Sequence, residues 1–184
     1  MLQEQVIRVL HIGKRASTLK KLTEVCVDQG FHVSWTNQLK QIEVITATYQ
    51  ASDYDVITFE QDINTETKEK LMIRFTKQNP QIKVITRLAA IPSLVIDQVY
   101  QTFRSDQHAL HIERIAPNQI ELANQNRCHI MVKHYWVNWL YQKKAAVLLN
   151  LEVDKGEMTV AWPHKSKQSY VTVVADNQVI EVLS

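Results

Sequence analysis

The sequence predicts an α/β fold in which five parallel strands form one doubly wound sheet, followed by a small antiparallel β segment. Short runs rich in β-branched residues alternate with segments of helical periodicity over the first two-thirds of the chain. The connections are long enough for right-handed crossovers, which place helices on both faces of a parallel sheet. After Pro117 this alternation stops, and β-rich runs separated by turn residues take over.

The five predicted strands of the parallel sheet are short and largely apolar. The first ends at Gly13, and the third is almost entirely apolar, as expected for a strand covered on both faces. In chain order they are Val6–Ile12, Phe31–Thr36, Asp55–Phe59, Ile82–Thr86 and Ala109–Ile115.

Four helices are predicted after the first four strands. Ser17 can cap the first helix at its N-terminus, and Gly30 can end it. The third helix has an acidic residue in its first turn and Lys77 in its last, which suits the helix dipole. The four helices are Ser17–Gln29, Ile42–Tyr49, Thr65–Lys77 and Pro92–Phe103.

The change after Pro117 predicts two domains, residues 1–117 and residues 118–184. Two hairpins are expected in the second, Ala145–Val153 with Glu157–Trp162 and Tyr170–Val174 with Val179–Leu183. The stretch Cys128–Tyr141 is rich in residues that favour strands, so we expect a strand there, with a helix as the alternative.

Composition narrows the functional classes. The chain has 184 residues with 21 basic and 19 acidic ones, a net charge of +2, so nucleic acid is not an expected partner. The first residues include Gln3 and Glu4 rather than a basic and then apolar leader, and no stretch is apolar enough for a membrane span, so we expect a cytoplasmic protein. Cys26 and Cys128 are expected to be reduced thiols.

The phrases VIRVLHIG, STLKKLTEVCVDQGFHV and DYDVITFE, in this order, resemble the receiver domain of bacterial response regulators over residues 6–117. The resemblance implies a flavodoxin-like fold and a role in signal transduction. Receivers carry a magnesium-binding acidic cluster after the first strand, where this chain has Gly13, Lys14 and Arg15. They carry a phosphoaccepting Asp at the end of the third strand, where this chain has Glu60.

Two further receiver positions lie near the ends of the later strands. Thr86 is the candidate for the small hydroxyl residue after the fourth strand. The Lys-Pro pair after the fifth strand is replaced by Ala116-Pro117. We therefore expect a degenerate receiver with no catalytic residue, no metal and no cofactor.

Lys14, Arg15 and Glu60 are expected to converge at one edge of the sheet, because the carboxyl ends of parallel strands meet there. A carboxylate beside two cations could mimic the charge of a phosphorylated site. The simpler alternative, which we favour, is a solvated ion pair of little energetic consequence. Lys14 and Arg15 could also hold an anion, whereas Gly13 lacks the further glycines of a dinucleotide-binding loop.

Aromatic residues concentrate in the last third of the chain. Tyr135, Trp136, Trp139 and Trp162 are candidates for a protein interface. The alternative, which we favour, is that they fill the core of a small sheet.

These observations predict a non-catalytic, receiver-like regulatory or adaptor protein that binds other proteins without phosphorylation. Receivers commonly dock, or pair with a second copy, through the fourth helix and fifth strand, here Pro92–Phe103 and Ala109–Ile115. The later region lacks a helix-turn-helix pattern, so a DNA-binding output is not expected.

Two other functions stay open. The phrases VLHIG and HYWVNWLYQKKAAVLLNLEVDKGEMTVAW resemble the N-terminal region of an accessory Sec-system protein that helps to export serine-rich adhesins, which implies a scaffold in a secretion complex. A small-molecule-binding or enzymatic α/β domain is the other alternative. It would require an apolar pocket with convergent polar groups at the strand ends.

Overall fold

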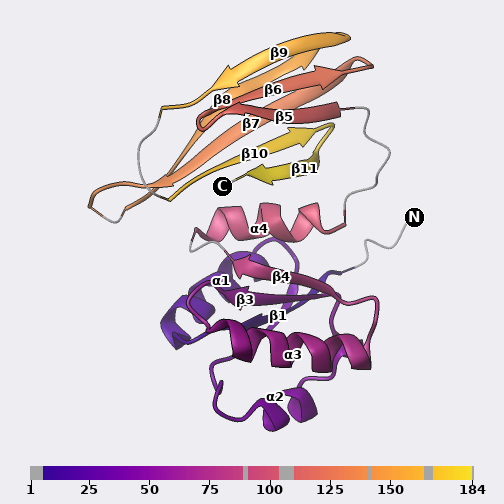
Figure 1. Cartoon of the computed structure of the whole chain (residues 1–184), viewed down its shortest axis with the longest axis vertical. Coiled ribbons are helices and arrows are strands. Elements are labelled where there is room, and N and C mark those ends of the chain that lie inside the picture. Colours follow the sequence, from indigo (N-terminus) through magenta and orange to yellow (C-terminus); the bar gives the residue numbers. More distant parts are fainter. Residues whose placement is uncertain (1–5, 89–90, 104–109, 141, 164–167, 184) are drawn as a thin grey trace. The chain divides into compact units, whose positions relative to one another are not determined.

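The computed structural model describes residues 6–88, 91–103, 110–140, 142–163 and 168–183. The chain divides into two compact units, Met1–Val99 and Tyr100–Ser184. We call them the α/β unit and the β unit (Figure 1). The division lies before the predicted fifth strand, whereas the sequence places it after Pro117.

The α/β unit contains a parallel sheet of four strands in the order β2-β1-β3-β4. Alternating strands and helices are thus confirmed for four of the predicted strands. The strands are β1 Arg8–Ile12, β2 His32–Thr36, β3 Val56–Glu60 and β4 Lys83–Leu88. The helices are α1 Ala16–Val27, α2 Ile42–Thr48, the 3-10 turn η1 Ala51–Asp53, α3 Thr65–Gln78 and α4 Pro92–Gln101.

Helices cover both faces of this sheet. Successive side chains of a strand point to opposite faces, so each strand contributes to two separate cores. On β1, Leu10 and Ile12 pack into a core with residues of α2 and α3, among them Phe75. Val9, which points the other way, packs with residues of α1 and α4, among them Leu22. The two cores hold the ends of β1 and β3 in fixed positions.

The prediction of a fifth parallel strand is wrong. Its residues do form a strand, β5 Leu110–Ala116, but it pairs antiparallel with β6 Gln119–Asn124 in the β unit. Pro117 and Asn118 make the short turn between them. A two-residue turn can join two antiparallel strands directly, whereas a parallel pair needs a crossover connection of about a dozen residues or more. Among the described residues, the parallel sheet therefore ends at β4.

The β unit has two antiparallel sheets with a shared core. Their strand orders are β11-β10-β7-β8 and β5-β6-β9, and buried residues from both sheets, such as Ile120 and Val132, pack together. Beyond β5 and β6, the strands are β7 Cys128–Val137, β8 Lys143–Val153, β9 Gly156–Ala161, β10 Ser169–Ala175 and β11 Gln178–Leu183. The expected small antiparallel sheet is thus two sheets rather than one.

Of the two expected hairpins, one is present and the other is not. The hairpin of β10 and β11 is confirmed, and its turn residues Asp176 and Asn177 both have positive φ, as a type I′ turn requires. The prediction of a hairpin between β8 and β9 is wrong, because β8 pairs with β7 and β9 pairs with β6. The chain passes from one sheet to the other at Asp154 and Lys155. Of the segment Cys128–Tyr141, residues 128–137 form the expected strand, residues 138–140 do not belong to it, and residue 141 lies outside the described residues.

Candidate functional site

The carboxyl ends of β1 and β3 lie side by side in the α/β unit. The two strands are parallel neighbours, and Ile12 is in register with Phe59. The residues that follow, Gly13 to Arg15 on one side and Glu60 on the other, therefore meet at the edge of the sheet where open α/β folds place ligands. We call this place the carboxyl edge.

The Glu60 side chain lies against the main chain of the loop between β1 and α1. Its Oε2 accepts a hydrogen bond from the amide of Lys14 at 2.7 Å and a longer one from the amide of Arg15 at 3.5 Å. The residue is only 8% exposed. Arg15 is the N-cap of α1 and its own side chain forms no capping bond. Glu60 thus supplies from another strand the anionic acceptor that a helix N-terminus favours.

Gly13 makes this arrangement sterically feasible. A Cβ on residue 13 would lie 2.5 Å from Cδ and from Oε2 of Glu60. Such a contact is far inside van der Waals distance, so any other residue would displace the Glu60 carboxylate from the loop. The glycine where a receiver has an acidic cluster is therefore explained by packing against Glu60.

The side-chain cations of Lys14 and Arg15 are not what binds the Glu60 carboxylate. The Arg15 guanidinium lies 3.4 Å from a carboxylate oxygen of Asp62 and is largely exposed. Among the ion pairs of the described residues, none joins Glu60 to Lys14 or Arg15. The three residues do meet, as expected from the strand ends, but through main-chain amides rather than through a solvated ion pair.

The other positions that the resemblance to receivers singled out, Thr86 and Ala116, do not join this contact. Thr86 is exposed on β4, and its carbonyl oxygen accepts a hydrogen bond from Nζ of Lys68 at 3.0 Å. Lys68 also donates to the carbonyl of Gln61 at 3.2 Å, so an α3 lysine that the sequence did not single out bridges the loop after β3 to β4. Ala116 ends β5 and belongs to the β unit. The docking face expected from α4 and a fifth parallel strand is not formed in the α/β unit.

A magnesium ion of the receiver type does not fit the carboxyl edge. Magnesium requires oxygen ligands with octahedral geometry. The loop after β1 instead presents N–H groups to the Glu60 carboxylate and carries two basic side chains. Within the described part of the chain, no three His, Cys, Asp or Glu side chains lie close enough to hold a metal ion.

A buried polar cluster below the carboxyl edge was not predicted. Nδ1 of His11 lies 2.6 Å from Oγ1 of Thr58, and its Nε2 lies 3.7 Å from Sγ of Cys26. Burial lowers the pKa of His11 to about 4 and raises the pKa of Cys26 to about 11. A thiol with a raised pKa is a poor nucleophile. The three side chains therefore serve as hydrogen-bonding partners for one another in the core rather than as a reactive site. The one sign of this cluster in the sequence is a histidine inside an apolar strand.

The four aromatic candidates of the β unit separate by exposure. Tyr135 and Trp162 are each 4% exposed and belong to the interior, as the core alternative predicts. Trp136 is half-buried and stacks on His134, with ring centroids 4.8 Å apart. Trp139 is different, since 84% of it is exposed.

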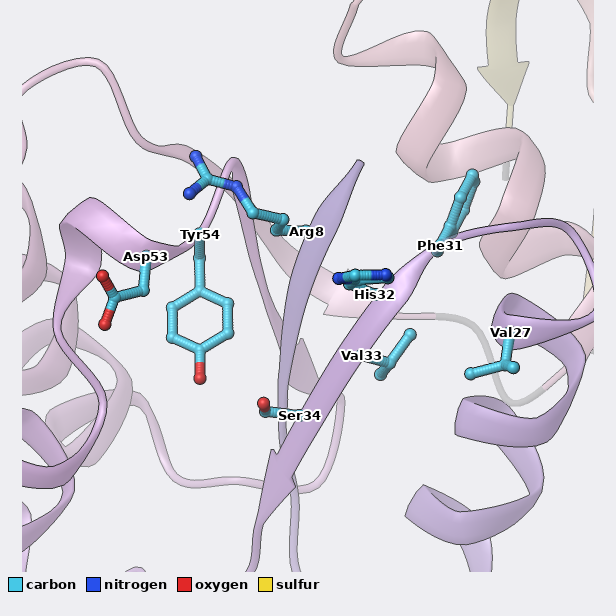
Figure 2. A pocket seen from close by; sticks show the side chains of 8 residues that line it. All are labelled: Arg8, Val27, Phe31, His32, Val33, Ser34, Asp53 and Tyr54. Atoms are coloured by element: carbon cyan, nitrogen blue, oxygen red, sulfur yellow. The ribbon is translucent and has the colours of Figure 1, made fainter. Parts of the chain in front are cut away.

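A pocket of about 470 Å³ opens at the amino ends of β1 and β2 (Figure 2). Its lining comes from β1, from the end of α1, from β2 with the residue before it and from η1 with the residue after it: Arg8, Val27, Phe31, His32, Val33, Ser34, Asp53 and Tyr54. The Arg8 guanidinium is already paired with Asp55, its NH2 lying 2.8 Å from Oδ1. The pocket lies at the opposite ends of the strands from the carboxyl edge, so it is not at the place where open α/β folds bind their ligands.

Comparisons with known proteins give no relatives. No protein-family model, no curated protein sequence and no solved structure matches the chain. Among the described residues, no helix is long and apolar enough to cross a membrane.

Proposed function

We propose that the chain is a non-catalytic, receiver-like regulatory or adaptor protein whose α/β unit binds another protein without being phosphorylated. In this proposal the parallel sheet is a receiver-type, doubly wound sheet that lacks its fifth strand. The strand order β2-β1-β3-β4 and the helices on both faces support it.

The observation that carries the proposal is the contact between Glu60 and the amides of Lys14 and Arg15. A receiver changes state when negative charge is added at the end of its third strand. Here a carboxylate permanently occupies the main-chain donors across from that position. The carboxyl edge would thus keep one conformation, and a partner would recognise that conformation.

Incubation with Mg²⁺ and acetyl phosphate tests the claim that phosphorylation has no part. The full chain and the Glu60→Asp variant, which restores the acceptor residue, are expected to show no added phosphoryl group by intact mass. The variant stays inactive because Gly13, Lys14 and Arg15 supply no carboxylate for magnesium. An acid-labile phosphoryl adduct on the unmodified chain would overturn the proposal.

The binding claim is tested with a protein partner purified from the source cells on the immobilised chain. Glu60→Gln keeps an acceptor oxygen and removes the charge, and it is expected to weaken partner binding about tenfold, equivalent to about 1.4 kcal/mol. Glu66→Gln makes the same change on the exposed face of α3 and should leave the dissociation constant unchanged. Circular dichroism checks that both variants fold. Equal binding by the two variants would contradict the proposed role of Glu60.

A further inference from the structure

The β7–β8 hairpin ends in a turn that is fixed by one asparagine. Oδ1 of Asn138 accepts hydrogen bonds from the amides of Leu140 at 3.1 Å and Gln142 at 2.8 Å. The Asn138 amide nitrogen donates to the carbonyl of Gln142 at 2.9 Å. Its Nδ2 donates to Oε1 of the same residue at 3.1 Å. We call residues 138–140 and 142–144 the hairpin tip.

The described residues of the tip present two large apolar side chains to solvent. Trp139 is 84% exposed and its neighbour Leu140 is 52% exposed. In contrast, Trp162 in the same unit is 4% exposed. Adjacent exposed apolar side chains on a well-bonded turn mark a contact surface, because a turn needs neither residue for its own stability.

Two lysines lie next to the apolar end of the hairpin. Lys143 and Lys144 begin β8 opposite Val137 and Trp136, and both are exposed. Consecutive residues of a strand point to opposite faces, so the two ammonium groups flank the hairpin on both sides. No Asp or Glu occurs between Glu121 and Glu152, although the whole chain is nearly balanced in charge.

We propose that the hairpin tip binds the surface of a membrane that contains anionic phospholipid. Trp139 and Leu140 would enter the interface between headgroups and acyl chains, where tryptophan is favoured. Lys143 and Lys144 would lie at the phosphate level and supply the preference for anionic lipid. A protein pocket could accept the indole, but it does not account for cations on both faces of the hairpin. This inference goes beyond the proposed function and does not depend on Glu60.

Co-sedimentation of the full chain with lipid vesicles tests the proposal. The chain is expected to bind vesicles of phosphatidylcholine that contain phosphatidylglycerol, and to bind phosphatidylcholine alone at least about tenfold more weakly. On binding, the tryptophan emission should shift to shorter wavelength, and this shift should be absent in Trp139→Ala. Added salt should release the protein from the vesicles.

Matched variants separate the hairpin tip from general charge and general apolarity. The K143Q/K144Q variant is expected to lose about tenfold in affinity for anionic vesicles. The K20Q/K21Q variant removes the same charge from two consecutive exposed lysines of α1 and should bind as the unmodified chain does. Ile73→Ala removes a side chain that is 69% exposed on α3 and should also leave binding unchanged, whereas Trp139→Ala should weaken it about tenfold.

Three results would overturn the proposal. One is equal binding to neutral and anionic vesicles. Another is an equal loss for the α1 and hairpin lysine pairs, which would indicate unspecific attraction. The third is no binding to anionic vesicles, and a protein partner whose affinity depends on Trp139 would then make the hairpin tip a protein interface.

Discussion

The carboxyl edge of the α/β unit and the hairpin tip of the β unit treat their interacting groups in opposite ways. At the carboxyl edge, the Glu60 carboxylate is 8% exposed and accepts hydrogen bonds from main-chain amides. At the hairpin tip, the polar groups of the turn are satisfied internally by Asn138, while Trp139 is 84% exposed. The carboxyl edge is closed, in the sense that its carboxylate is bound by the chain's own amides. The hairpin tip is open, in the sense that its indole is left in solvent.

The two sites are both held by hydrogen bonds, but they differ in which groups are left exposed. Both sites are fixed by hydrogen bonds to the main chain, so neither owes its state to a loose loop. The carboxyl edge uses those bonds to satisfy a charge, which favours a constant conformation. The hairpin tip uses them to keep apolar surface in water, which favours contact with something outside the chain.

The largest effect is expected from the buried tryptophan of the β unit, Trp162, which is the counterpart of the exposed Trp139. Trp162→Ala should lower the free energy of unfolding of the β unit by about 3–5 kcal/mol, because a buried aromatic side chain is replaced by a cavity. Its backbone is also tied at both groups to Asn118, at 3.0 and 2.9 Å. Urea denaturation followed by tryptophan fluorescence measures the change. A loss below 1 kcal/mol would mean that residue 162 is not part of the core.

A smaller effect is expected from acid, through the buried histidine below the carboxyl edge. The folded pKa of His11 is about 4, whereas its ordinary pKa is 6.5. Between these values the unfolded chain binds a proton that the folded chain does not. The free energy of unfolding of the α/β unit should therefore fall by roughly 3 kcal/mol as pH falls from 6.5 to 4, and level off below. Urea denaturation at several pH values measures this slope.

Two variants check that assignment. His11→Gln should abolish the slope between pH 6.5 and 4. Asp55, whose pKa its hydrogen bond with Arg8 lowers from 3.8, stabilises the fold above that pH and loses this contribution only as pH falls below it. Asp55→Asn should therefore leave the slope above pH 4 unchanged. An identical slope in His11→Gln would show that another group titrates in this window.

A third prediction concerns the close approach of Gly13 and Glu60. Gly13→Ala should cost about 2 kcal/mol, because its Cβ would expel the Glu60 carboxylate from the loop amides. Glu60→Ala should cost a similar amount. In the Glu60→Ala background, Gly13→Ala should become neutral or slightly stabilising, since alanine restricts the unfolded chain.

A double-mutant cycle measured by urea denaturation tests this coupling. The expected interaction energy is about 1–2 kcal/mol. Additive effects of the two substitutions would show that Glu60 does not depend on the absence of a Cβ at residue 13. The Glu60 carboxylate would then have room to keep its hydrogen bonds beside a Cβ at residue 13.

Local patterns explain what the sequence predicted well. The helix predicted over Thr65–Lys77 is α3, Thr65–Gln78, whose N-cap Asn64 accepts a hydrogen bond from the amide of Thr67. Capping, helical periodicity and β-branched runs are properties of a few neighbouring residues, so a single sequence carries them.

Strand partners depend on distant residues, and there the sequence was insufficient. Ala109–Ile115 has the composition of a strand, but nothing within it chooses between a parallel and an antiparallel neighbour. The choice depends on the turn at Pro117 and Asn118 and on the inward side chains of β6. A turn at Pro117 is compatible with a domain boundary as well as with a hairpin, so the sequence alone did not predict the antiparallel pairing.

The sequence predicted which residues of the candidate site lie together, but not which of their atoms are in contact. The meeting of Glu60 with Gly13, Lys14 and Arg15 follows from the rule that parallel strand ends share an edge. Which atoms meet does not follow from it, because main-chain amides and side-chain cations are equally near in sequence. The contact of His11 with Cys26 joins two elements through tertiary packing, and no local pattern encodes it.

The smallest effect is expected at the open site. Trp139→Ala should change the free energy of unfolding by no more than about 0.5 kcal/mol, because an indole that is 84% exposed buries little surface when the chain folds. The same substitution at Trp162 removes the same atoms from the interior, so the pair isolates burial from residue type. Urea denaturation of both variants under one set of conditions gives the comparison directly. A loss above 1 kcal/mol at Trp139 would mean that the indole packs on the β unit, and the hairpin tip would then be closed by its own chain in the way the carboxyl edge is.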